Sequence, residues 1–454
     1  MYKYRYVARV LIEATTPLRT ASGKSDIFID SPVLKDWNGL PMILGSSIAG
    51  VLRHSFDEQI AETIFGFERE GKDEGEGSRI IVSHAHLCDA NGRVHQGLGG
   101  LSNDDAILPH YSSLPVREHV AIDHKGTVDG RGKFDEEVVF RGSRFRFELE
   151  FLSNKPQSDE EWEAILQRLN DPLLRLGAGG TKGFGQFKIV ACYERCYEMG
   201  RDYHNKPSDM NELIAEQSTD HSSHHTPTKY VINLQPEDFF IFGAGFGDDE
   251  VDDVAVTEKI VEWDDADKGS FSNLQILFPA SSLKGALSHR VAFHYNRLTG
   301  IWADDEKTDI EEHTGTNSHA VATLFGAPKG HTNEGKGKAL LSDMYKPYDE
   351  TQTKIFDHVR IDRFTGGAMD GALFSEKTIA NSDTWRVEIL LSDEIDSKVK
   401  EAFEATLDDL AKGWLPLGGK VNRGHGVFIS PDYKEGNPDK RGWSLIAGGG
   451  KDAE

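Results

Sequence analysis

Two groups of loop aspartates are the residues of this chain best suited to chemistry on a phosphate. Asp26 and Asp30 lie in "SDIFIDSPVLKD", and Asp252 and Asp253 lie in "DDEVDDVAVTEK". Carboxylate oxygens bind hard divalent ions such as Mg2+ or Mn2+, and such an ion stabilises charge on a phosphate and helps to activate an attacking hydroxyl. The alternative is that these loop aspartates only form turns.

The two aspartate loops align when Asp30 is matched with Asp253, since "DSPV" then faces "DVAV". Both loops precede a helix start that begins with two serines. This alignment makes Asp30 and Asp253 the predicted metal ligands, with Asp26 and Asp252 as further catalytic candidates.

Two glycine-rich loops are suited to binding a polyanion. "GAGGTKGFG" and "GGKVNRGHG" present backbone N–H groups that no side chain obstructs, with basic residues alongside. Neither is a dinucleotide fingerprint, because each follows a predicted helix and precedes a predicted strand. We predict phosphate contacts from these loops at Gly180, Lys182, Gly183, Gly419, Lys420, Arg423 and Gly424.

Two serine-rich helix starts, "LGSSIAGVLRH" and "PASSLKGALSHR", are predicted to add contacts. A serine there can cap the first helical turn and touch a phosphate. A nucleophilic serine is disfavoured, because neither start has the G-x-S-x-G elbow. Basic residues about one turn further on are expected to project along the same face. The predicted contacts are Ser46, Ser47 and Arg53 in the first copy, and Ser281, Ser282, Lys284 and Arg290 in the second.

These features occur in the same order in both halves of the chain. "REHVAID" and "FDHVRID" match His119 with His358, and "GRGKFDEEVV" and "DGALFSEKTI" match Phe134 with Phe374. Collinear repeats of this kind indicate two homologous domains. We predict a first domain at 1–198, a polar linker at 199–228, a second domain at 229–444 and a flexible tail at 445–454.

Each half also repeats one order of secondary structure. A strand pattern ("YRYVARVLIEATT", "KYVINLQPEDFFIF") precedes the serine-start helix, and further strands, a second helix and a closing strand follow. This order predicts an α+β fold of two tandem ferredoxin-like, or RRM-like, domains with insertions.

Composition limits the function classes. The 454 residues are 38% hydrophobic and 28% charged, and no run approaches the length of a membrane span. We therefore expect a cytoplasmic protein without a membrane partner. The net charge of −24 disfavours nucleic acid, but the acidic residues concentrate in a few loops, which leaves room for a local basic groove. The three cysteines are expected to be buried thiols.

The combined pattern resembles the RAMP superfamily of CRISPR proteins, specifically the backbone subunits of type III effector complexes. The resemblance is carried by G-S-S-x-x-G-x-x-R from Gly45, "IDSPV" from Ile29, "HVRIDRFTGGAMDGALF" from His358 and the two glycine loops. Two such domains in one chain resemble the fused double backbone subunits of type III-D-like systems, which are prokaryotic.

The resemblance implies a subunit that binds CRISPR guide RNA beside other type III effector subunits and cleaves complementary target RNA at a loop aspartate with a divalent metal. It matches Asp30 with that aspartate, whereas "DDVAVTEK" departs from "IDSPV", so the first domain is expected to be the active one. Ala49 and Ser288 also depart from the family pattern, which implies that the two domains bind the guide with unequal strength. It extends the RNA contacts to His119, His358, Arg360 and Arg363.

Two other functions stay open from the sequence. One is a guide-holding scaffold that does not cut. The other is a guide-processing endoribonuclease with a histidine-centred site, for which His54, His119 and His425 are available.

Overall fold

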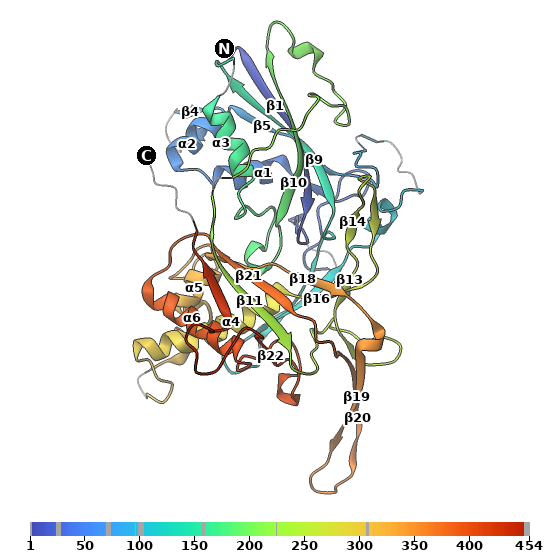
Figure 1. Cartoon of the computed structure of the whole chain (residues 1–454), viewed down its shortest axis with the longest axis vertical. Helices are drawn as coiled ribbons and strands as arrows, with labels where there is room; N and C mark the ends of the chain where they lie inside the picture. Colours follow the sequence, from blue (N-terminus) through green and yellow to red (C-terminus); the bar gives the residue numbers. More distant parts are fainter. Residues whose placement is uncertain are drawn as a thin grey trace.

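The computed structural model describes residues 2–23, 29–69, 74–95, 97–98, 104–156, 159–223, 225–305 and 308–448. The chain forms two halves that follow one another along its long axis, with a long hairpin projecting beyond the second half (Figure 1). Within the described part of the chain, no helix is both long and apolar enough to cross a membrane.

An antiparallel sheet forms the centre of the first half. Its strand order is β10-β1-β9-β6-β2, with β5 also paired to β9. Alternate residues of the central strand are buried against the helices, among them Val10 and Ile12, as the period of two in a strand requires. The strands are β1 (Tyr4–Ala14), β2 (Met42–Ile43), β5 (Ile80–Val82), β6 (Ala85–Leu87), β9 (Arg144–Ser153) and β10 (Phe187–Glu198), and a small ribbon is formed by β3 (Phe67–Glu68) and β4 (Gly75–Glu76).

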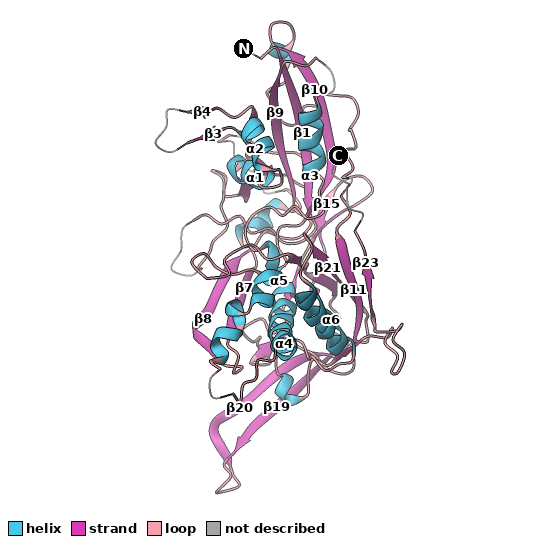
Figure 2. Cartoon of the chain, turned by 90° about the vertical axis from the view of Figure 1, so that its left-hand side faces the viewer, coloured by secondary structure: helices cyan, strands magenta, loops and turns pink. Residues whose placement is uncertain are grey.

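Helices α1 (Gly45–Arg53), α2 (Glu58–Phe65) and α3 (Glu160–Leu169) lie beside this sheet (Figure 2). Their apolar residues recur at helical spacing and are buried in the same core cluster as the sheet, for example Ile48 and Leu52 in α1. Asp159 caps α3 by accepting a hydrogen bond from the backbone N–H of Glu161.

The predicted polar linker is instead packed on the first half. The guanidinium of Arg9 donates to the backbone carbonyls of Pro207, Asp209 and Glu212 at 2.5–2.6 Å, and Met210 and Ile214 are buried. The sequence pattern predicted a linker because most residues of this segment are polar. It did not identify the two buried apolar residues, nor the backbone carbonyls that bind the buried Arg9. We call residues 199–223 the strap.

The second half repeats the plan. Its sheet has the order β17-β21-β11-β22, with β23 also paired to β11. Because β23 runs to Ile446, the tail predicted from residue 445 begins too early. The elements are β11 (Thr228–Pro236), β17 (Ala339–Leu340), β21 (Trp385–Leu391), β22 (Phe428–Ile429) and β23 (Trp443–Ile446), with helices α4 (Ala280–Thr299), α5 (His319–Phe325) and α6 (Ser397–Ala411).

Residues of the second half also form smaller sheets, of which the β14–β15 ribbon packs on the core of the first half. One has the order β13-β16-β18, one pairs β14 with β15, and one has the order β12-β20-β19. Their strands are β12 (Asp253–Val254), β13 (Thr257–Glu258), β14 (Val261–Trp263), β15 (Gly269–Phe271), β16 (Gln275–Phe278) and β18 (Met344–Pro347), with β19 and β20 as given below.

Each half carries a long hairpin, and the two hairpins match in register. In β7 (Val116–Ile122) and β8 (Val128–Glu137), His119 pairs with Phe134. In β19 (Thr353–Ile361) and β20 (Ala368–Ile379), His358 pairs with Phe374. The sequence match between these residues is therefore confirmed.

The two hairpins have different surroundings. The β7–β8 hairpin lies along the second half, whereas the β19–β20 hairpin projects away from the body (Figures 1 and 2). In the joint between the halves, the guanidinium of Arg117 in β7 binds both carboxylate oxygens of Glu258 at 2.7 and 2.8 Å and Asp343 at 2.5 Å. The phenol of Tyr345 completes this buried group, which we call the joint cluster. The tandem arrangement fits the structure, and the finer ferredoxin-like assignment stays a prediction.

Candidate functional site

In the first half, Asp30 lies at the base of the β7–β8 hairpin beside a second aspartate. The backbone N–H of Asp30 donates to Asp135 Oδ1 at 2.7 Å, and the N–H of Asp135 donates to Asp30 Oδ2 at 3.1 Å. Asp30 is exposed and Asp135 half-buried. This reciprocal pairing brings two carboxylates to one edge of the hairpin. Asp26 lies outside the described residues.

In the second half, the residue equivalent to Asp30 is Asp252 and not Asp253. Asp252 Oδ2 accepts a 2.8 Å hydrogen bond from the N–H of Ser375, which is one residue past Phe374, as Asp135 is one residue past Phe134. The next residue of each loop makes an equivalent parallel pair: Ser31 with Glu136, and Asp253 with Glu376.

The alignment of Asp30 with Asp253 was therefore wrong by one residue. Because Asp252 and Asp253 are adjacent, a sequence alignment cannot decide which of them corresponds to Asp30. The pairing of this loop with the hairpin allows only the register in which Asp252 does. Asp253 forms an ion pair with Lys420 at 2.9 Å, which makes its carboxylate a poor metal ligand.

A buried glutamate that the sequence analysis missed lies next to each aspartate site. In the first half, Glu136 is 3% exposed and lies 2.8 Å from Arg19, 3.4 Å from Lys182 and 3.4 Å from the ring of His119. Burial alone would raise its pKa, but His119 and the two cations outweigh it and lower the pKa of Glu136 to about 2.

The second half repeats this arrangement around Glu376, which is fully buried. Its carboxylate lies 2.9 Å from His358, 3.0 Å from His425 and 2.8 Å from Arg423. Burial opposes ionisation, yet these partners lower the pKa of Glu376. The repeated spacing of Phe134 to Glu136 and Phe374 to Glu376 was the sequence signal for both glutamates.

An aromatic ring completes each of the two clusters. His119 stacks on Phe134 with 5.1 Å between ring centroids, and His358 stacks on Phe374 at 4.9 Å. The cation of Lys182 lies 4.7 Å from the Phe134 ring, and that of Arg423 lies 4.4 Å from the Phe374 ring. Each cluster therefore ties a glycine loop to a hairpin base, and the predicted phosphate ligands Lys182 and Arg423 already have carboxylate partners.

The glycine loops approach backbone too closely for side chains. A Cβ on Gly177 would lie 2.3 Å from the carbonyl oxygen of Arg19, and one on Gly418 would lie 2.5 Å from that of Ile241; both have positive φ. Gly180 packs against Arg175 and Gly419 lies near Ile241. The two loops differ at their tips, because Gly183 faces Ala280 and Asp343 of the second half while Gly424 is open.

The serine side chains do not cap their helices, so that part of the prediction was wrong. The first N–H of each helix is satisfied by another residue: Gly45 N–H donates to His84 Nδ1 at 3.1 Å, and Ala280 N–H donates to Asp343 Oδ1 at 2.7 Å. Both serines are exposed in the first half and half-buried in the second. The exposed pair is Ser46 and Ser47, and the half-buried pair is Ser281 and Ser282.

The basic residues of the two helices are engaged by protein groups. Arg53 donates to the carbonyl of Gly66 at 2.6 Å, and Arg290 pairs with Asp409 at 2.9 Å. These two arginines therefore do not project freely along the serine face, because nearer protein acceptors hold them. On the projecting hairpin, Arg360 is exposed, as is Arg363 beyond the end of β19.

Lys284 lies in the joint between the halves. Its ammonium donates to Thr181 Oγ1 at 3.1 Å and to the carbonyl of Phe325 at 2.9 Å. Burial, with a smaller contribution from the charge of Lys182, lowers the pKa of Lys284 to about 8.

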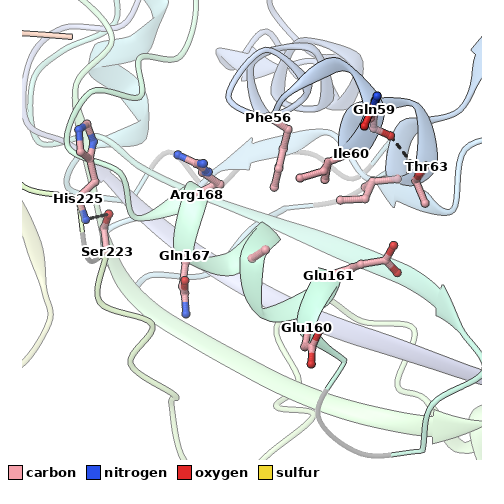
Figure 3. A pocket seen from close by; sticks show the side chains of 12 residues that line it. Phe56, Gln59, Ile60, Thr63, Glu160, Glu161, Gln167, Arg168, Ser223 and His225 are labelled. Carbon is pink, nitrogen blue, oxygen red and sulfur yellow. Dashed lines mark hydrogen bonds between the residues drawn. The ribbon is translucent and has the colours of Figure 1, made fainter. Parts of the chain in front are cut away.

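Among the described residues, no group of three or more His, Cys, Asp or Glu side chains is arranged to hold a metal ion. Asp30 and Asp135 nevertheless suit Mg2+ or Mn2+, since Mg2+ is commonly held by one or two carboxylates together with water and substrate phosphates. A separate hollow of 590 Å³ lies between α2 and α3 and includes none of the predicted site residues (Figure 3).

Comparison with protein families agrees with this duplicated arrangement. The RAMP superfamily model matches residues 11–188 and 275–429, one region in each half. The chain therefore belongs to the RAMP superfamily, and this membership indicates a CRISPR-associated RNA-binding subunit of an effector complex. A search of curated proteins found no match.

Proposed function

We propose that this chain is a fused double backbone subunit of a type III CRISPR effector complex, and that it holds guide RNA and cleaves guide-paired target RNA at the first hairpin base. The observation that carries the proposal is the Asp30–Asp135 pair, where two accessible carboxylates lie beside a hairpin and a glycine loop. Base pairing with the guide would select the target sequence. The protein therefore needs to recognise only the RNA backbone and the shape of the duplex.

A divalent ion at these carboxylates would neutralise charge that develops on the scissile phosphate. Asp30 would accept a hydrogen bond from the 2′-hydroxyl of the target nucleotide and hold it in line with that phosphate. The glycine loop would hold the neighbouring backbone, and the Glu136 cluster would keep the loop and hairpin at a constant separation.

The second half is proposed to be the weaker or inactive copy. Its loop aspartate, Asp252, faces Ser375 where the first half has Asp135, so only one carboxylate is presented. The adjacent Asp253 is neutralised by Lys420.

A non-catalytic scaffold is the second candidate, and it is favoured by the hydrogen bonds through which Asp30 and Asp135 hold each other's backbone N–H groups, a structural role for both carboxylates. Guide processing has less support, because the rings of His119 and His425 lie against buried glutamates.

The test is cleavage of end-labelled RNA complementary to the guide by the assembled complex with Mg2+ or Mn2+. Asp30→Asn and Asp135→Asn should each abolish one cut while target binding persists, and Asp253→Asn serves as the matched control that retains that cut. Unchanged cleavage by the complex with the Asp30→Asn variant would show that Asp30 does not take part in the cut. The scaffold function would then remain as the proposal for this chain.

A further inference from the structure

The surface of the first half that corresponds to the joint cluster is open. Strand pairing shows the correspondence: Met42 pairs with His86 as Leu277 pairs with Tyr345, which places His86 at the position of Tyr345. The helix-start contacts likewise place His84 at the position of Asp343.

Asp36 completes this surface at the position of Glu258. Its Oδ2 lies 4.0 Å from His86 Nδ1, as Glu258 contacts Tyr345. Residues Asp36, His84 and His86 therefore form an equivalent of the joint cluster, which we call the open face. His84 is exposed, and Trp37 beside Asp36 is 81% exposed.

The open face differs from the joint cluster in hydrogen-bonding polarity. Asp343 uses one oxygen for a helix N–H and the other to accept from Arg117. His84 accepts its helix N–H at Nδ1, so the neutral ring carries its proton on Nε2 and presents a donor. Where the joint offers an acceptor to an arginine, the open face offers a donor.

Asp36 supplies an acceptor to the open face, but its carboxylate is turned toward its own loop. Asp36 Oδ1 accepts from the N–H groups of Asn38 and Leu40, and its side chain is only 10% exposed. His86 Nδ1 is buried and has no hydrogen-bond partner among the residues that the structure describes.

A second copy of this chain does not complement the open face. On the projecting hairpin the position of Arg117 is taken by Phe356, because Arg117 pairs with Glu136 as Phe356 pairs with Glu376. The Lys284–Thr181 bond also has no equivalent, since Lys284 is replaced by Ala49 in the first half. End-to-end stacking of two copies would therefore lack the polar contacts of the internal joint.

We propose that the open face docks a different protein subunit, one that presents a carboxylate where the internal joint presents Arg117, and that two copies of this chain do not stack through it. A carboxylate is the strongest acceptor for an imidazole N–H, and complementary polarity selects among homologous partners. The inference rests on the proposed role in an assembly and is independent of RNA cleavage.

The test converts the projecting hairpin into the proposed partner. Phe356→Glu supplies a carboxylate to the wild-type open face of a second molecule, whereas Phe356→Arg supplies the wrong sign. Since Phe356 packs against Phe239 and His425, both variants remove that packing, and Phe356→Leu controls for its loss. Self-association is measured by sedimentation velocity over a range of concentrations, without RNA.

The wild type, Phe356→Leu and Phe356→Arg should stay monomeric, and Phe356→Glu should associate at least about tenfold more tightly than Phe356→Leu. Adding His84→Ala to Phe356→Glu should abolish this association. Adding His84→Asp to Phe356→Arg should create it by restoring the polarity of the joint. Absence of association in Phe356→Glu, equal association of the Glu and Arg variants, or wild-type dimers that His84→Ala dissociates would each overturn the proposal.

Discussion

Replacing Arg117 with methionine should destabilise the joint between the two halves. Its guanidinium makes two bonds to Glu258 and one to Asp343, and the three side chains are exposed by only 5%, 6% and 0%. Methionine keeps much of the buried volume but leaves two carboxylates without a cation. Removing one partner of a buried ion pair costs about 3–5 kcal/mol, because the remaining charge has lost its solvent and its counter-charge.

The cost should depend on pH in a defined direction. Burial already raises the pKa of Asp343 despite Arg117, and loss of the guanidinium will raise this pKa further. A carboxyl group whose pKa is raised by folding stabilises the fold below its unfolded pKa and loses that contribution as pH rises through its folded pKa. The deficit of Arg117→Met relative to wild type should therefore be larger at pH 8 than at pH 5.

Differential scanning calorimetry at both pH values measures the effect. A loss of 1 kcal/mol lowers Tm by about 2–4 °C for a domain of this size. The Tm of the unfolding transition that disrupts the joint between the halves should therefore fall by about 6–20 °C at pH 8. A triple variant with Asp343→Asn and Glu258→Gln should recover most of the loss, because both residues become neutral. A fall below about 2 °C at pH 8, or a triple variant less stable than Arg117→Met, would refute this reasoning.

Three further predictions concern the glycine loops, Lys284 and the strap. Gly183→Ala should destabilise the joint more than Gly424→Ala in calorimetry, because both have positive φ but only Gly183 would place a Cβ against the second half. Because burial in the joint lowers the pKa of Lys284 to about 8, the unfolded chain binds more protons above that pH, and the free energy of unfolding of wild type relative to Lys284→Met should rise between about pH 8 and pH 10 in a urea titration. The hydrogen bond to Glu194 raises the pKa of His221. The stabilisation of the strap by this bond should therefore be fully present below about pH 6.5 and should fall as pH rises through the raised pKa of His221. Hydrogen exchange in the strap should show this loss as faster exchange, and an exchange free energy that does not depend on pH would contradict the prediction.

Much of the repeat could be predicted because it rests on local chemistry. His119 and Phe134 match His358 and Phe374 in sequence, and the hairpin registers confirm these pairs. The glycine loops were recognisable because only glycine tolerates the close carbonyl contacts made there by Gly177 and Gly418.

The errors arose where partners distant in sequence decide the outcome. Asp252 takes the place of Asp30 because its carboxylate accepts from Ser375, more than a hundred residues away. Arg290 seemed free from its helical spacing, yet Asp409 on α6 binds it. The strap was taken for a linker because its apolar anchors, Met210 and Ile214, are few and far apart.

The sequence by itself determined that the chain is a duplicated RAMP protein with two glycine loops and two hairpins, because repeats and backbone-limited glycines leave their signature in residue order. Only the tertiary structure decided which aspartates correspond, that Glu136 and Glu376 are buried beside them, and that Arg117 closes one joint while Asp36, His84 and His86 leave another face open. Burial, strand register and ion pairing depend on which segments distant in sequence come into contact. These tertiary contacts cannot be predicted from local sequence patterns.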